Sequence, residues 1–302
     1  MHLSIDTPIS KVLQGVFNVY RDRVPDVQKI TDAMVAQGIV SGQSEILNDH
    51  IAFRTLGVPH LGIASFEKIF LAHGYDKRDY FFFEGKKLNA YWYSPPHDEL
   101  PRIFISELRV ADLSEKAQEI ISKYTEAIDS DPVDALDLND VEAVTEFFHR
   151  PLWQLPSLED YQTLLQESEY AAWVIYNRYY LNHYTISVHQ LDGAHRTLEQ
   201  FNDFLKSIGV VLNNSGGEIK VSPDGLLRQS SSVAEKVEAE FAGGQKAVIA
   251  GSYVEFAERL PLPEFAHLPF QEIRRHMRRD GFESGNADKI FESTFTTQTQ
   301  RN

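Results

Sequence analysis

The sequence predicts an α+β protein in which two βαβββ modules form a half-open curved sheet. The main observation is an internal repeat: His50 and His183 each stand in an alternating, strand-like segment, and a helical pattern ending in glycine follows each one. His183 lies 133 residues after His50, and Gly209 lies 135 residues after Gly74. The offset between the two copies therefore differs by only two residues between the strand and the helix, so we interpret the segments as copies of one unit. Pairing of the two units is expected to create a concave ligand-binding face.

The rest of the chain is expected to surround these two modules within a single domain, residues 1–302. From the pattern of apolar residues and breakers we predict five parts, which are N-terminal helices at 7–40, the first module at 46–110, a helical insertion at 111–180, the second module at 181–260 and a helical C-terminal tail at 261–302.

The N-terminal part reads as two amphipathic helices. Thr7 can cap the first helix and Pro8 suits its first position, while a second helix is expected to start after Pro25 and to stop at Gly38. In the first module, the strand at 48–56 is followed by a helical pattern and three further strands, expected at 65–72 (helix), 80–83, 87–94 and 102–110 (strands).

The insertion and the second module repeat this reasoning. Three helical stripes are expected in the insertion, beginning near Ser114, Val141 and Tyr161. The second module is expected to contain a strand at 182–190, a helix at 196–208 and strands at 218–221, 225–229, 237–241 and 247–256. The tail contains four closely spaced arginines, Arg274, Arg275, Arg278 and Arg279. They fit a solvated helix face, and a lid over the site is the alternative.

Composition excludes several classes of protein. A formal net charge of −15 argues against nucleic acid or an anionic membrane surface as the main partner, although one local arginine can still hold a small anion. The absence of cysteine removes disulfides, thiolate metal sites and cysteine nucleophiles, so a metal site must use histidines and carboxylates. We see no signal peptide and no apolar run of about 18 residues, and therefore expect a soluble cytoplasmic protein of open oligomeric state.

Strand alternation picks out three candidate metal ligands. His50 and His183 hold matching places in the two repeats, and each shares a face with other polar residues. A structural role for each histidine and a role as metal ligand are about equally supported by the residues alone. A carboxylate would complete a two-histidine site, and Glu255 fits because Val254 and Phe256 would point the other way, as would Glu258.

Arg54 lies on the same face as His50, four residues further along the strand. Its Cα is expected roughly 13 Å away at about 3.3 Å per residue, a spacing that suits a small dicarboxylate with one end on the metal and the other on the guanidinium. A structural salt bridge is the alternative for Arg54.

Other polar residues are weaker candidates. Glu107 ends the first module as Glu255 ends the second, so it could be a fourth ligand or a hydrogen-bond acceptor near the metal, and His189 could support His183. Gln229 and Ser230 stand in a polar stretch that we expect to line the substrate pocket, with a surface turn as the alternative.

Three segments also carry a family resemblance: NDHIAFRT at 48–55, NHYT at 182–185 and GSYVEFAER at 251–259. Together they resemble the signature segments of the 2-oxoadipate dioxygenase/decarboxylase family, also called hydroxyglutarate synthases. The resemblance extends from about residue 10 to 295 and includes NADKIF at 286–291.

The resemblance implies a vicinal-oxygen-chelate-like fold and ferrous iron, Fe(2+), as cofactor. It implies His50, His183 and Glu255 as iron ligands and Arg54 as the contact to a substrate carboxylate. The implied reaction takes O2 and a 2-oxo dicarboxylic acid, converting 2-oxoadipate into 2-hydroxyglutarate and CO2. Two alternatives remain open: a glyoxalase-like metal-dependent lyase or isomerase, for which Glu107 is the residue to examine, and a non-catalytic small-molecule-binding protein.

Overall fold

A computed structural model describes residues 3, 5–191 and 193–301 of the chain. Its main feature is an eight-stranded sheet with the order β2-β3-β4-β1-β5-β10-β7-β6. The strands are β1 (Asn48–Leu56), β2 (Asp76–Phe83), β3 (Leu88–Ser94), β4 (Arg102–Leu108), β5 (His183–Ser187), β6 (Lys220–Val221), β7 (Leu227–Ser231), β8 (Lys236–Glu240), β9 (Lys246–Ala250) and β10 (Tyr253–Arg259).

This order is the signature of two equivalent halves. In each half the first strand pairs in parallel with the last, β1 with β4 and β5 with β10, and the two first strands meet antiparallel at the centre. The helices are α1 (Pro8–Arg23), α2 (Pro25–Ala36), α3 (Ile63–Leu71), α4 (Glu115–Thr125), α5 (Val141–Phe147), α6 (Leu158–Glu167), α7 (Glu169–Asn177), α8 (Leu198–Ser207), α9 (Ser284–Phe291) and α10 (Thr296–Thr299). The predicted fold class is confirmed.

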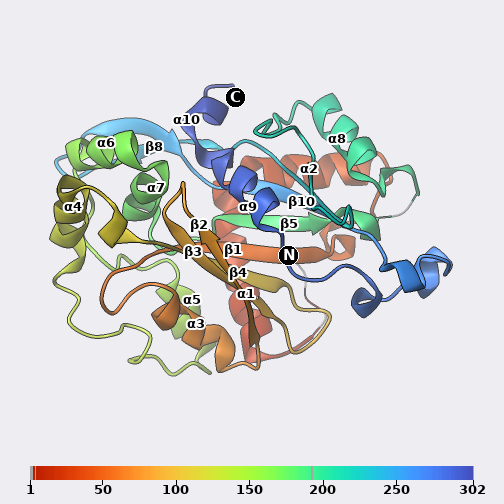
Figure 1. Cartoon of the computed structure of the whole chain (residues 1–302), viewed down its shortest axis with the longest axis horizontal. Coiled ribbons are helices and arrows are strands. Elements are labelled where there is room, and N and C mark those ends of the chain that lie inside the picture. The colour runs from red at the N-terminus through yellow and green to blue at the C-terminus, as the bar shows by residue number, and fades with distance from the viewer. Residues whose placement is uncertain (1–2, 4, 192, 302) are drawn as a thin grey trace.

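The predicted alternation in β1 is also confirmed. Phe53 points to the convex face, where its ring centroid lies 4.9 Å from that of Phe66 in α3. On the same side, α1 packs beneath β5, with 4.9 Å between the ring centroids of Phe17 and Tyr184. Helices thus bury one face of the sheet, and Figure 1 shows α1 and α2 behind it. The other face is left to residues of opposite parity, which include His50.

Two details of the second module and the insertion differ from the prediction. The segment predicted as a strand at 237–241 is β8, and the one predicted at 247–256 is divided between β9 and β10. Only β10 joins the main sheet, because β8 and β9 pair with each other as a separate hairpin. Gly243 and Gly244, both with positive φ, form its turn. The insertion also contains a fourth helix, α7, whose mostly apolar and buried residues carry no amphipathic stripe.

The C-terminal tail differs most. Residues 270–277 form short 3-10 turns in place of a helix, and Arg278 is buried, so the predicted solvated helix face is wrong. Arginine side chains there bond to backbone carbonyls of other segments, as when Arg275 Nη1 donates to Leu100 O at 2.9 Å. Further on, α9 contacts β2, β6 and β7 and lies over the concave face of the sheet (Figure 1). Among the described residues, no helix is long and apolar enough to cross a membrane.

Candidate metal centre

Three adjacent strands bring one potential ligand each to the same point of the concave face. His50 comes from β1, His183 from β5 and Glu255 from β10, and all three side chains are buried. Glu255 Oε1 lies 3.4 Å from His50 Nε2, and Glu255 Oε2 lies 3.0 Å from His183 Nε2. One ligand atom from each residue falls within 4.8 Å of the others. Such a set is able to hold a metal ion.

Neighbouring polar groups fix how these ligands point. His183 Nδ1 is 3.1 Å from Asn182 Oδ1, an arrangement that places the proton on Nδ1 and leaves the Nε2 lone pair facing Glu255. Gln229 Nε2 donates to Glu255 Oε1 at 2.7 Å. On the other side, the carboxylate of Asp49 lies 3.7 Å from His50 Nδ1. His183 and Glu255 thus each have a hydrogen-bonded partner, whereas His50 Nδ1 makes no hydrogen bond among the described residues and His50 Nε2 lies 3.1 Å from Thr185 Oγ1.

The three groups shift one another's protonation. Burial alone would raise the pKa of Glu255, but His50 and His183 outweigh it and lower that pKa below its usual range. Burial tends to lower the pKa of His50, whereas Glu255 and Asp49 raise it overall; for His183 burial prevails and the pKa is lowered. A carboxylate that stays ionised beside a neutral imidazole is the state a divalent cation needs.

Strand parity separates Glu255 from the other glutamates considered. Glu258 points to the convex face, where its Oε2 accepts a hydrogen bond from the backbone N–H of Leu198 at 3.0 Å. Glu107 does the same in the first module, since its Oε2 accepts from the N–H of Ile63 at 2.8 Å. The two glutamates thus cap α8 and α3, respectively. The suggestion that Glu107 is a fourth ligand or an acceptor near the metal is therefore wrong.

Arg54 reaches into the same concave side and is 1% exposed. Its Nη1 donates to Thr294 Oγ1 at 3.0 Å and its Nη2 to Phe291 O at 3.1 Å, both in the C-terminal tail. Its Nε makes no hydrogen bond, and no carboxylate lies within ion-pair distance of it in the described part of the chain. The structural salt bridge considered for Arg54 is thus not formed.

Two further predictions concern β7 and the end of β5. Gln229 lines the cavity beside Glu255 as expected. Ser230 does not, because alternation turns it to the convex face, where its Oγ donates to Asn202 at 2.8 Å, and its predicted contact to substrate is wrong. His189 accepts from the N–H of Arg259 at 3.2 Å and has no hydrogen bond to His183 in the described part of the chain, so its suggested supporting role is also wrong.

Aromatic residues complete the cavity, and most of them could not be predicted from the sequence. Tyr253 shares the parity of Glu255 and packs on His183, with ring centroids 4.8 Å apart. The ring of Phe282 stands edge-on to that of His50 at 4.7 Å, although these residues are far apart in the chain. The full lining is His50, Phe104, His183, Gln229, Tyr253, Glu255, Phe282, Ala287, Ile290 and Phe291.

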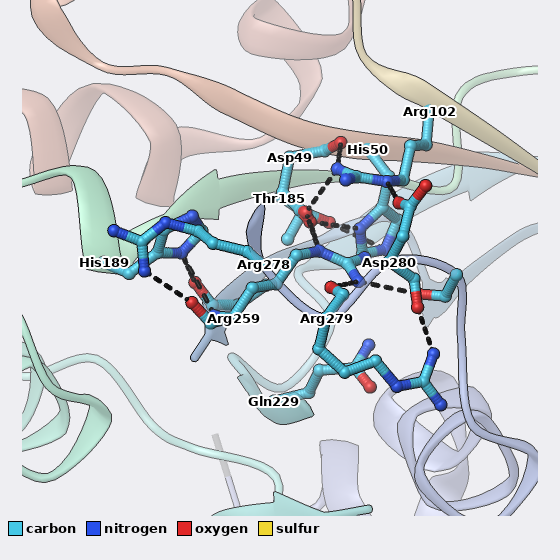
Figure 2. A network of polar contacts seen from close by, with 12 residues as sticks. Asp49, His50, Arg102, Thr185, His189, Gln229, Arg259, Arg278, Arg279 and Asp280 are labelled. Carbon is cyan, nitrogen blue, oxygen red and sulfur yellow. Dashed lines mark hydrogen bonds and ion pairs between the residues drawn. The ribbon is translucent and has the colours of Figure 1, made fainter. Parts of the chain in front are cut away.

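A network of charged residues, buried except for Asp280, anchors the tail beside His50 (Figure 2). Asp49 accepts from Arg259 Nε at 2.6 Å and from Arg102 Nη1 at 3.2 Å. Arg102 Nε in turn donates to Asp280 at 2.6 Å, and Arg259 Nη1 donates to Gly281 O at 2.7 Å. These contacts hold the segment that carries Phe282 against the strands that carry the histidines.

Comparison with known proteins identifies the family of this chain. The sequence model of the 2-oxoadipate dioxygenase/decarboxylase family matches residues 12–267. A plant protein from Oryza sativa named 2-oxoadipate dioxygenase/decarboxylase, chloroplastic/amyloplastic, is 43% identical over 98% of this chain and 81% of its own length. Its counterpart in Arabidopsis thaliana, named chloroplastic, is 42% identical over 96% of this chain and 78% of its own.

Solved structures give the same picture. The hydroxyglutarate synthase from Oryza sativa, crystallised in complex with 2-oxoadipate, has a TM-score of 0.87 and 44% identity, covering 96% of this chain and 93% of that one. A protein from Ralstonia eutropha assigned to the glyoxalase superfamily, with a TM-score of 0.72, 22% identity and coverage of 94% and 90%, shares the fold alone.

The names of the two plant relatives place those proteins in plastids. This finding contradicts the cytoplasmic location expected from the sequence, which rested only on the absence of a visible targeting pattern. The family match spans most of the chain, and both plant relatives are named as enzymes. The chain belongs to the 2-oxoadipate dioxygenase/decarboxylase family of enzymes.

Proposed function

We propose that this chain is an iron(II)-dependent dioxygenase that converts 2-oxoadipate and O2 into 2-hydroxyglutarate and CO2. The observation that carries the proposal is the buried set of His50, His183 and Glu255 in a chain of this family. Oxygen-activating non-haem iron enzymes use two histidines and one carboxylate, because this set leaves coordination positions open for substrate and O2. The balance closes, since the six carbons of the substrate leave as a five-carbon acid and CO2.

The chain's own residues fit a ferrous ion. His50 Nε2, His183 Nε2 and an oxygen of Glu255 would hold it, with Asn182 and Gln229 keeping two of these ligands in place. Bound ferrous iron would supply the redox chemistry that allows O2 to react with the 2-oxo acid. Because the pKa of Glu255 is lowered, its carboxylate is available as a ligand throughout the neutral range.

Arg54 would bind the carboxylate at the far end of the substrate. Its buried guanidinium donates to two neutral groups, Thr294 and the carbonyl of Phe291, and lies within 5.1 Å of the ring centroids of Tyr170 and Trp173, while its Nε has no hydrogen-bond partner among the described residues. A buried cation without a counter-ion is costly, so an incoming carboxylate offsets that cost. The distance between one carboxylate at the metal and another at Arg54 would then select for a dicarboxylic acid.

Substrate entry would require the tail to move. The cavity beside the three ligands has a free volume of only about 20 Å³, close to that of one water-sized sphere. The side chains that fill the remaining space are Phe282, Ile290 and Phe291, all from the tail. Because Arg54 bonds to this tail, binding of a carboxylate to Arg54 and displacement of the tail would be coupled, and closure would exclude water from the reaction.

The experiment is oxygen consumption by anaerobically purified protein reconstituted with ferrous iron. We expect 2-oxoadipate to start oxygen uptake and to release CO2 and 2-hydroxyglutarate in equal amounts. The monocarboxylate 2-oxohexanoate lacks the distal carboxylate and should be a poor substrate for the parent. The parent and the Arg54→Met variant should turn it over equally well. Turnover of 2-oxoadipate without O2 would refute the proposal, and unchanged KM in Arg54→Met would refute the role of Arg54.

The geometry favours no second function. A glyoxalase-like lyase or isomerase with four protein ligands would need another carboxylate at the metal, and Glu107 faces α3 on the opposite side of the sheet. Among the described residues, His50, His183 and Glu255 are the group of histidines and carboxylates that converges closely enough to hold an ion.

A further inference from the structure

A second cavity lies on the far side of the charge network from the metal ligands. It has a volume of about 270 Å³ and shares no lining residue with the cavity that contains His50. Its walls come from the start of β1 and β4, the residues after β5, the end of β10 and the turn at 275–278. Four arginines line it: Arg102, Arg259, Arg275 and Arg278.

Three of these arginines have their charge matched by nearby carboxylates. Arg102 and Arg259 share Asp49, and Arg102 also bonds to Asp280. Arg275 lies 3.9 Å from Asp98, whose side chain is largely exposed at the rim. Arg278 is different, because its Nη1 donates to a backbone carbonyl, Arg259 O at 2.8 Å, and no carboxylate lies within ion-pair distance of its guanidinium in the described residues.

The unpaired nitrogens point to a missing acceptor. Arg278 is 5% exposed and Arg259 is 1% exposed, yet Arg278 Nε, Arg278 Nη2 and Arg259 Nη2 are buried without a hydrogen-bond partner in the described part of the chain. Buried polar groups in native proteins are nearly always paired, and an unpaired buried cation is unfavourable. Figure 2 shows Arg278 at the end of the network next to His189 and Arg259, and all three residues line the second cavity.

We propose that this second cavity is a binding site for a small oxyanion, separate from the metal centre, in which Arg278 and Arg259 are the main ligands. A guanidinium presents planar pairs of N–H donors that match the oxygens of a phosphate or a carboxylate group. The volume is sufficient for one such small anion. Asp49 cannot serve as the missing acceptor for the unpaired nitrogens, because its two oxygens already accept from Arg259 and Arg102.

The test is calorimetric titration of the iron-loaded protein with inorganic phosphate and, separately, with succinate. The titration is repeated with Arg54→Met, whose metal cavity lacks its carboxylate contact, so binding that is unchanged in this variant comes from a second site. We expect one equivalent of at least one probe to bind, and the probe that binds tells a phosphate ligand from a carboxylate ligand. If neither probe binds saturably, the proposal is overturned.

Variants then assign the binding to this cavity. Arg278→Gln should weaken the binding of the probe at least tenfold, while Arg274→Gln, an exposed arginine of the same turn outside the cavity, should leave it unchanged. Gln190→Glu adds a negative charge at an exposed residue of the cavity wall and should weaken binding without disturbing buried contacts, which keeps the test decisive if Arg278→Gln fails to fold. Binding of parental strength in both Arg278→Gln and Gln190→Glu would refute the assignment.

Discussion

The two modules of the sheet are built alike but contribute unequally to the metal centre. In the first module His50 lies opposite Arg102, and in the second His183 lies opposite Tyr253. Five residues after Arg102 and after Tyr253, both modules carry a glutamate that caps the module's helix. The modules differ two residues after Arg102 and Tyr253, where the first module has Phe104 and the second has Glu255.

This difference leaves the candidate site with three potential metal ligands and not four. Phe104 and Glu255 occupy matching places on the concave face, so a carboxylate at position 104 would complete a symmetrical set with two histidines and two carboxylates. The aromatic ring instead packs against Phe282 of the tail, at 5.0 Å between centroids. One half of the repeat thus supplies the carboxylate, and the other half supplies an apolar wall of the cavity beside the three potential ligands.

The largest expected effect comes from removing the carboxylate that only the second module has. Glu255→Ala should reduce iron affinity more than about 100-fold, beyond the loss typical for a residue that merely supports a ligand. Glu258→Ala removes a carboxylate three residues away that faces the other side and should retain iron. Iron content after dialysis measures both variants, and equal iron loss in both would contradict the assignment by parity.

Making the modules symmetrical should have the next largest effect. Phe104→Glu places a carboxylate opposite Glu255, where it would occupy a coordination position that substrate or O2 needs. We expect iron to stay bound and turnover to fall by about tenfold or more, while Phe104→Leu keeps an apolar wall and most of the activity. The iron-dependent rise in melting temperature should be larger in Phe104→Glu than in the parent; a smaller rise would show that position 104 does not face the metal.

A third contrast concerns the residue six positions after each of His50 and His183, which is Leu56 in the first module and His189 in the second. Burial lowers the pKa of His189 to about 3. Between that value and the unfolded value near 6.5, the unfolded chain binds a proton that the folded chain does not, so stability falls as pH drops. The loss is about 1.4 kcal/mol per pH unit.

The variant His189→Leu copies the first module and should remove this part of the acid sensitivity. Urea unfolding at pH 7 and pH 5 measures it, since the parent should lose about 2 kcal/mol more than the variant over this interval. An equal loss in both proteins would contradict the buried neutral state of His189.

The smallest effects should come from the glutamates that the modules share. Glu107→Gln and Glu258→Gln each remove a charge at a helix N-terminus and should cost about 1 kcal/mol, or about 2 °C in melting temperature. Neither should change iron content. If Glu107→Gln released iron, Glu107 would have to reach the metal and the equivalence of the two glutamates would fail.

Much of the fold followed from local patterns. Alternation in β1 and β5 and the constant offset of the glycine-terminated helices predicted the two modules, because both depend on residues close together in the chain. The separate β8–β9 hairpin did not follow, since a strand pattern does not reveal which strand it pairs with. The spacing of Arg274, Arg275, Arg278 and Arg279 suits a helix face, but contacts with distant segments hold these residues in turns.

The site also has a part that local sequence patterns predict and a part that depends on distant contacts. His50, His183 and Glu255 could be placed on one face because each lies on a strand whose parity is visible in the sequence, whereas Gln229 was predicted only from the polar stretch around it. Ser230 was wrongly predicted from the same stretch, because a residue adjacent to Gln229 on a strand must face the other side. Phe282 and Phe291 reach the cavity only because the tail folds back across the sheet, and no nearby residue in the sequence indicates that return.

The most direct test of the central claim is diffraction from iron-loaded crystals at the iron absorption edge. We predict a single anomalous peak at about 2 Å from His50 Nε2, His183 Nε2 and a Glu255 oxygen, the usual length of such bonds. No peak should lie near Glu107. Iron bound elsewhere, or a site that lacks any one of these three residues, would contradict the account.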